Sequence, residues 1–325
     1  SVIPFLLVGW AVGTVRAFPE TRYGISWNAA YARYLSVSSE EGLKAALEDL
    51  KVEHVRFSVD WAAIEAQEGV FRWDDLDRHL DLMARQGVPI TLAIGFKTPR
   101  WPECAHPDWT KSLSQEAREQ ALRAYLVALI RHVRERSEIV SWQVENEPFF
   151  PFGACEPRRL EDIQAEFALV RALDPYEPFH RSIVVTDSGE LGRWLPFSPV
   201  IDAIGFSVYR VTDNPVLGVR TYDWLPPWWY ARKAALLRFF TGMRYYSSEL
   251  QMEPWMLTDL KSASPEQMFR TFSVARMKVN HWEMDRLQMP HVDLWGVEWW
   301  YWMKEQKNIP GYWEEARKIF ANDAS

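Results

Sequence analysis

The sequence predicts an α/β fold, a single-domain (β/α)8 TIM barrel. Strand-like and helix-like segments alternate from residue 22 to the end of the chain, and eight of them are strand-like. Alternation of this kind is typical of a parallel sheet, and eight units commonly close the sheet into a barrel. A chain of 325 residues with 48% hydrophobic residues and no linker is long enough for one such barrel.

The predicted strands are short runs rich in β-branched and aromatic residues, bounded by glycine, proline and polar residues. They cover residues 23–27, 54–59, 89–94, 140–145, 182–186, 203–208, 244–248 and 292–297. Helical patterns fill the intervals, at residues 43–50, 74–86, 114–136, 160–173, 230–240, 265–287 and 312–320. Ser39 is the predicted N-cap of the first helix, and Gly87 ends the second.

Charge and motif content exclude several classes of protein. The formal net charge is −7 and the pI is about 5.6, so nothing favours binding to nucleic acid or to an anionic membrane surface. The sequence has no phosphate-binding glycine loop, no dinucleotide fingerprint, no paired-histidine metal signature and no Gly-x-Ser-x-Gly elbow. We therefore expect neither a cofactor nor a metal.

The first residues differ in composition from the rest. Residues 2–15 carry no charge and open on an apolar run, similar to the apolar core of a signal peptide or the end of a membrane anchor. The alternative is an apolar extension packed on the barrel. Residues 1–20 are accordingly set apart from a barrel domain at 21–325. We expect the protein to be exported and to be periplasmic, extracellular or anchored to a membrane. A cytoplasmic protein is the alternative.

Cys104 and Cys155 follow the third and fourth predicted strands. Adjacent loops on one barrel face could bring the two sulfurs together in a disulfide, and two free thiols are the alternative. A disulfide would agree with export.

Two glutamates stand at predicted strand ends. Asn146-Glu147-Pro148 closes the fourth strand, and Glu249 follows the aromatic run of the seventh. Two carboxyl groups that meet at one barrel face are what cleavage of a glycosidic bond by an acid/base and a nucleophile requires. Either glutamate of each neighbouring pair could be the catalytic one. Glu145 should share a strand face with Glu147, and Glu253 lies four residues after Glu249.

The chain resembles the clan-A glycoside hydrolases, whose acid/base and nucleophile lie on strands four and seven. Asn146-Glu147-Pro148 is similar to their acid/base motif, and Glu249 stands where their nucleophile would be. The segments 55–61 and 69–73 look like their second-strand region. The likeness covers roughly residues 22–320 and is nearest to family 5 or a neighbouring family. It implies a retaining hydrolase of β-linked oligo- or polysaccharides.

The resemblance also implies roles for further residues. Asn146 would bind the sugar 2-hydroxyl, Arg56 would orient Glu249 and keep it charged, and Tyr209 would hydrogen-bond Glu249. Trp300, or else Trp299, would form the floor beneath the sugar.

Other polar and aromatic residues near strand ends are candidate sugar contacts, because flat rings stack on sugars. They are Trp101, Glu253, Glu298, Lys97, Arg100, Asp187 and Glu190. Two competing hypotheses remain: a catalytically silent carbohydrate-binding barrel, and a barrel hydrolase or lyase whose glutamates bind a metal.

Overall fold

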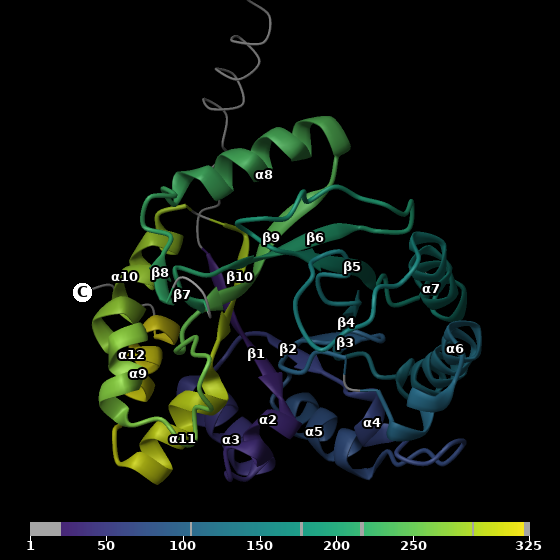
Figure 1. Cartoon of the computed structure of the whole chain (residues 1–325), viewed down its shortest axis with the longest axis horizontal. Helices are drawn as coiled ribbons and strands as arrows, with labels where there is room; N and C mark the ends of the chain where they lie inside the picture. Colours follow the sequence, from purple (N-terminus) through teal and green to yellow (C-terminus); the bar gives the residue numbers. More distant parts are fainter. Residues whose placement is uncertain (1–20, 105, 176–177, 215–217, 288, 322–325) are drawn as a thin grey trace, which may run out of the picture.

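The fold is a closed barrel of eight parallel strands surrounded by helices (Figure 1). The computed structural model describes residues 21–104, 106–175, 178–214, 218–287 and 289–321. The strands follow the order β1-β10-β9-β6-β5-β4-β3-β2, and the pairing of β1 with β2 closes the ring. The predicted fold class is confirmed.

All eight predicted strands are present, with small shifts at their ends. They are β1 (Arg22–Asn28), β2 (Val55–Ser58), β3 (Ile90–Ile94), β4 (Ile139–Val144), β5 (Ser182–Asp187), β6 (Ala203–Val208), β9 (Arg244–Gln251) and β10 (His291–Trp295). Most of their residues are buried, because the barrel interior is filled with side chains and the helices cover its outer surface. This double burial explains why the strands read as nearly continuous apolar runs.

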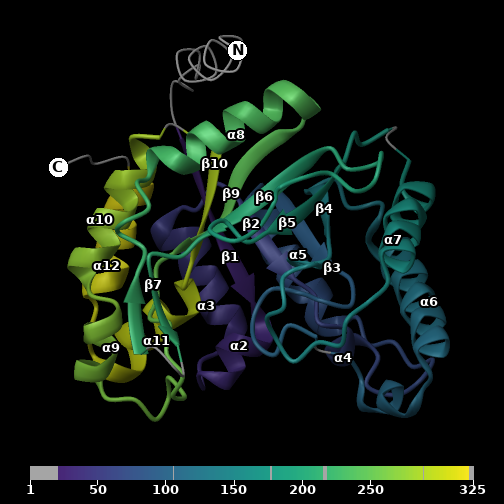
Figure 2. The ribbon, with the colours of Figure 1, turned by 45° about the horizontal axis from the view of Figure 1, so that its top comes forward.

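The helices confirm most of the predicted intervals. They are α2 (Ala29–Tyr34), α3 (Ser39–Ala45), α4 (Trp61–Ile64), α5 (Asp74–Arg85), α6 (Gln115–Val133), α7 (Leu160–Leu173), α8 (Trp228–Thr241), α9 (Pro265–Thr271), α10 (Val274–Asp285), α11 (Val297–Lys307) and α12 (Gly311–Phe320). A π-helical turn, η1 (Ala46–Leu50), extends α3, and a 3-10 turn, η2 (Asp108–Ser112), precedes α6. Figure 2 shows α6 and α7 together on one flank of the barrel, where they contact each other.

Three local predictions were wrong, and each error lies at a helix end. Ser38, not Ser39, caps α3, because the Ser38 side chain accepts a bond from the Glu41 amide. The predicted helix 265–287 is broken, since Phe272 is extended and Ser273 caps a second helix. The predicted strand 292–297 ends at Trp295, and α11 begins at Val297 after Gly296.

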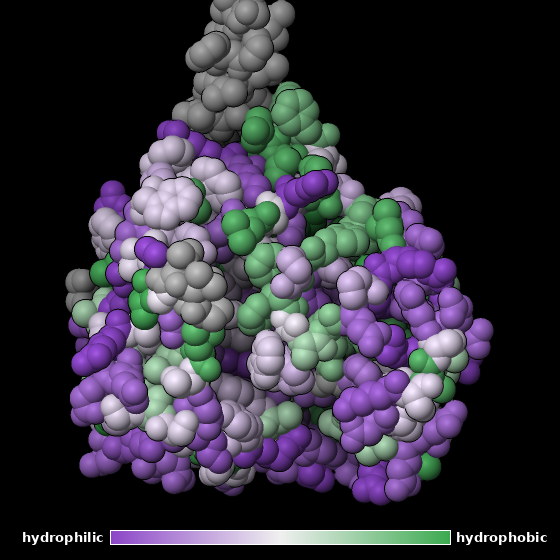
Figure 3. Space-filling view, viewed as in Figure 1, coloured by the Kyte–Doolittle hydropathy of each residue, from purple (hydrophilic) through white to green (hydrophobic). Residues whose placement is uncertain are grey.

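The long loop after β6 carries a small hairpin of β7 (Val211–Asn214) and β8 (Gly218–Thr221) that the sequence did not predict. β7 packs against α9 (Figure 2). Apolar side chains gather over α8 on the face drawn in Figure 3. Within α8, Phe240 is largely exposed. Among the described helices, none combines the length and apolar content that crossing a membrane requires. The predicted segment 1–20 lies outside the described residues.

Candidate active site

Arg56 connects the polar residues at the carboxyl ends of the strands. Its side chain is fully buried on β2, and its Nε donates to Gln143 Oε1 at 2.5 Å. One terminal nitrogen donates to Glu249 Oε1 and the other to Asn146 Oδ1, both at 2.8 Å. A buried guanidinium must have its donors satisfied, and its planar fork holds both partners in fixed directions. Arg56 thus brings together the ends of β4 and β9.

Glu249 lies within β9, which runs three residues further than predicted. Its Oε1 accepts from Arg56, and its Oε2 accepts from the Tyr209 hydroxyl at 2.9 Å. Burial and the nearby Glu249 carboxylate raise the pKa of Tyr209, so the phenol keeps its proton and donates it. Two donors, one on β2 and one directly after β6, therefore bind the two oxygens of Glu249 and fix the direction of its carboxyl group.

Glu147 has a different environment. Its Oε1 accepts from the Ser207 hydroxyl at 2.8 Å, and its amide donates to Thr186 Oγ1. Burial, then the negative charges of Glu249 and Glu103, raise the pKa of Glu147 well above its usual value. Ser207 is also the register partner of Glu249 between β6 and β9, so the two carboxyl groups share one neighbourhood. Glu147 is held in its neutral form.

Hydrogen bonds to the side-chain oxygen of Asn146 hold this residue in place. Its Oδ1 accepts from Arg56 at 2.8 Å, from Thr186 Oγ1 at 2.9 Å and from Gln143 Nε2 at 3.3 Å. These bonds set the orientation of the amide, so the Nδ2 donor is turned to the other side, towards Glu103 at 3.4 Å. The amide is oriented as a donor at the site.

Glu145 does not share the face of Glu147, contrary to the strand-alternation prediction. The strand ends at Val144, and Glu145 has φ +62°, which turns its side chain outward. Its carboxylate accepts from the amides of Phe96 and Lys97 and from Arg158, at 2.6–3.0 Å. It belongs to a buried cluster around Arg158 instead.

Glu253 and Glu298 lie on either side of Arg100. Arg100 forms an ion pair with each of them, and its guanidinium lies between the rings of Tyr31 and Trp295 at 3.9 and 4.0 Å. Glu298 also accepts from a backbone amide on β1 and is fully buried. Burial raises the pKa of Glu253 to about 7, although Arg100 opposes that shift. Glu253 therefore lies in a separate ion-pair group from Glu249.

The prediction that Trp299 or Trp300 forms the sugar floor was wrong. Both side chains have 0% exposure and belong to α11, because β10 ends before them. Trp300 Nε1 donates to the Met252 carbonyl, and Trp299 packs on Tyr312 with ring centroids 4.4 Å apart. Neither ring has a free face for a ligand.

Trp101 is 68% exposed and begins a line of aromatic rings. It contacts Phe152, Phe152 contacts Trp255, and Trp255 contacts Tyr209, with centroids 4.9–5.9 Å apart. This line leads from the surface to the phenol that binds Glu249. The predicted placement of Trp101 at the rim agrees with it.

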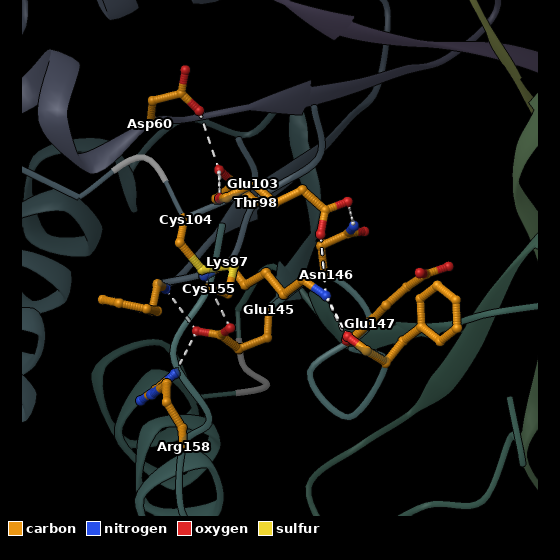
Figure 4. The surroundings of a disulfide bond; sticks show 12 residues. Asp60, Lys97, Thr98, Glu103, Cys104, Glu145, Asn146, Glu147, Cys155 and Arg158 are labelled. Carbon is orange, nitrogen blue, oxygen red and sulfur yellow. Dashed lines mark hydrogen bonds and ion pairs between the residues drawn. A yellow bond between two sulfur atoms is a disulfide. The ribbon is translucent and has the colours of Figure 1, made fainter. Parts of the chain in front are cut away.

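Cys104 and Cys155 form a disulfide with a Cα–Cα distance of 5.3 Å (Figure 4). The bond joins the loop after β3 to the loop after β4. Of the two alternatives for this pair, the disulfide is the one present.

Sequence reasoning missed four polar residues at the site: Glu103, Gln143, Thr186 and Ser207. Gln143 and Ser207 precede Glu145 and Tyr209 by two, so strand alternation could have found them. Glu103 had no such signal beyond its place next to Cys104. The predicted Asp187 and Glu190 instead accept backbone amides, from Trp194 and Tyr209 respectively.

One group in the described part of the chain has metal-ligand spacing: His54, His291 and Asp293. His54 precedes β2, and the other two begin β10, so the group lies at the amino ends of the strands. Glu147 and Glu249 lie at the opposite ends. This arrangement separates the group from the paired carboxyl groups.

Comparisons agree with this architecture. Residues 40–141 match the Glyco_hydro_42 family, described as β-galactosidase. β-Galactosidase BbgII of Bifidobacterium bifidum is 32% identical over 104 residues, which is 27% of this chain and 15% of that protein. These findings support the predicted likeness to clan-A glycoside hydrolases, but they do not support the predicted family 5. Neither Glu147 nor Glu249 lies in the segment matched by the family.

Solved structures share the fold over most of the chain. Xylanase 10B from Thermotoga maritima has a TM-score of 0.59 at 13% identity and covers 94% of this chain and 96% of its own. The exo-β-1,4-mannosidase Op5Man5 from Opitutaceae bacterium strain TAV5 has a TM-score of 0.59 at 14% identity, covering 94% and 61%. These identities support the barrel alone.

Proposed function

We propose that the protein is a retaining glycoside hydrolase that cleaves β-linked glycosides or polysaccharides by double displacement. The observation that carries the proposal is the unequal treatment of two neighbouring carboxyl groups. Glu249 accepts from Arg56 and Tyr209, whereas Glu147 is buried next to negative charge. Paired acids whose surroundings favour opposite protonation states are suited to nucleophile and general acid.

In the first step Glu249 would attack the anomeric carbon and form a glycosyl ester, while Glu147 gives its proton to the departing oxygen. In the second step Glu147, now ionised, would take a proton from water. The resulting hydroxide equivalent attacks the anomeric carbon and releases Glu249, so Glu147 ends protonated again. After the second step Glu249 is again a free carboxylate and Glu147 is again protonated, as before the reaction.

Asn146 and the aromatic line would bind the sugar. The Nδ2 of Asn146 is the donor suited to a hydroxyl next to the anomeric carbon. Trp101 presents an exposed ring on which a further sugar could stack. The match of residues 40–141 to a β-galactosidase family supports β-linked substrates.

We also propose that the protein is exported. Disulfides persist mainly in oxidising compartments, and Cys104 is joined to Cys155. The uncharged residues 2–15 agree with a targeting or anchoring role. Membrane contact would occur only through that segment. Fractionation of cells, with thiol labelling before and after reduction, tests the location.

The function is tested by a screen of chromogenic β-glycosides and polysaccharides with the wild-type protein, Glu147→Gln, Glu249→Gln and the rival Glu253→Gln. Turnover should be lost in the first two variants and kept in the third. Azide should restore turnover to Glu249→Gly as an α-glycosyl azide, the inverted product. A dead Glu253→Gln beside an active Glu249→Gln would reverse the assignment. Sugar binding without turnover would favour the silent barrel.

A further inference from the structure

A third acidic side chain, Glu103, lies beside the two glutamates and has no step in the reaction above. It follows β3 in the loop that precedes Cys104 and is only 6% exposed. One carboxylate oxygen forms an ion pair with Lys97 Nζ at 3.1 Å. The other accepts from Asn146 Nδ2 at 3.4 Å. Figure 4 shows the carboxyl group turned towards Asn146.

The surrounding loop holds Glu103 in place. Its backbone has φ +66°, a left-handed conformation that costs energy in a non-glycine residue. The Thr98 amide donates to its carbonyl at 2.9 Å, and the disulfide begins at the next residue. The loop after β4 closes over it, because a Cβ on Gly153 would come within 3.1 Å of its Oε2. A strained, locked acid at this position suggests a functional reason.

Lys97 connects this acid to Glu147. Its Nζ donates to the carbonyls of Glu147 and Phe150, each at 3.0 Å, in addition to its pairing with Glu103. All three ammonium donors are therefore used within the protein. Lys97 holds the backbone of the acid and the carboxylate of Glu103 in one unit.

We propose that Glu103 is a positioning residue of this site, which keeps Glu147 protonated and, with Lys97, holds the acid and the Asn146 amide in place. The proposal rests on the proposed function. The charged groups that face Glu147 are Glu249 from β9 and Glu103 and Lys97 from the loop after β3. Ser207 and Thr186 contribute only hydroxyl groups.

Glu103 and Lys97 should shift the pKa of Glu147 in opposite directions. A carboxylate next to Glu147 disfavours a second negative charge there, and an ammonium favours it. Burial raises the pKa of Glu103 to about 7, so its charge is present in the alkaline range. In that range Glu103 acts to keep the acid protonated, while Lys97 acts in the opposite direction.

Two substitutions should therefore move the pH profile in opposite directions. Glu103→Gln keeps the shape and removes the negative charge, so the alkaline limb of kcat/KM should move to lower pH by about one unit. Lys97→Met should move the limb to higher pH. Glu103→Asp keeps the charge and should keep the limb. Loss of structure alone would lower kcat without this opposed pair of shifts.

Glu65→Gln is the matched control, because Glu65 is equally buried but bonds to Trp61 and Gly69 outside the site. It should leave the limb in place. The proposal is overturned if Glu103→Gln leaves the limb unmoved, or if the Glu103→Gln and Lys97→Met limbs move in the same direction. Titration of the ¹³C-labelled Glu147 carboxyl by NMR, assigned with Glu147→Gln, gives the same answer without turnover. If the wild-type protein cleaves no glycoside, the proposed function is refuted. The NMR titration still decides whether Glu103 and Lys97 shift the pKa of Glu147.

Discussion

Glu145 and Glu147 follow the same strand two residues apart, yet their surroundings are opposite. Glu145 accepts from two backbone amides and from Arg158, which also pairs with Glu119 and Glu166. Glu147 has one hydroxyl donor and two carboxylate neighbours. An acid with a cationic partner holds the fold together, whereas an acid with negative neighbours is ready to carry a proton. Their partners, not their residue type, separate the two roles.

The largest expected difference between the two positions is in turnover. Glu147→Gln removes the proton donor and should lower kcat by roughly 10²- to 10⁴-fold on substrates with poor leaving groups. Glu145→Gln should change kcat by less than about tenfold, because its contacts lie outside the site. Steady-state kinetics on one β-glycoside compares them. An equal loss of kcat in the two variants would show that Glu145 and Glu147 do not differ in catalytic and structural role.

The second difference is in stability. Glu145→Gln should lower the free energy of unfolding by about 2 kcal/mol, because Arg158 loses a charged partner and two amides compete for one oxygen. Urea unfolding at pH 7 measures this change. A more stable variant would mean that three carboxylates around Arg158 are too many, and that the cluster does not hold the fold together.

Tyr209 offers a smaller test of how Glu249 is held. Tyr209→Phe removes one of the two hydrogen-bond donors to Glu249 and leaves the ring packed against Trp255. We expect kcat to fall by about tenfold, equivalent to one hydrogen bond of about 1.4 kcal/mol to a charged group. Unfolding curves of the variant serve as the control. Unchanged kcat would show that Arg56 orients Glu249 alone.

The smallest expected effect is a gain in stability for Glu147→Gln. The raised pKa of Glu147 means that the folded state binds a proton more tightly than the unfolded state. Wild-type stability is therefore lost as pH rises from the usual glutamate pKa to the raised value. The Gln variant avoids this loss and should be more stable by about 1 kcal/mol at pH 8, with no gain near pH 4. Thermal unfolding at both pH values measures it, and a destabilised variant at pH 8 would contradict the unfavourable burial of Glu147.

Local pattern was sufficient wherever the chain keeps a regular period. All eight strands and the whole of α7 (Leu160–Leu173) were predicted, because apolar periodicity directly reflects which faces are buried. Predictions from periodicity failed where the backbone of a single residue breaks the regular strand or helix geometry. The left-handed backbone at Glu145 reverses its side chain, and Gly296 begins a helix that carries Trp299 and Trp300 into the core.

The sequence alone determined that this protein is a barrel with glutamates at two strand ends, because burial period and strand termination are local properties. The resemblance already implied that Arg56 orients Glu249, and the structure contains that pair. Only the tertiary structure decided that Glu145 faces outward and that Glu103 joins the site. These outcomes depend on contacts between loops far apart in the chain. The charge that each carboxyl group carries depends on those contacts, through burial and through the sign of its neighbours.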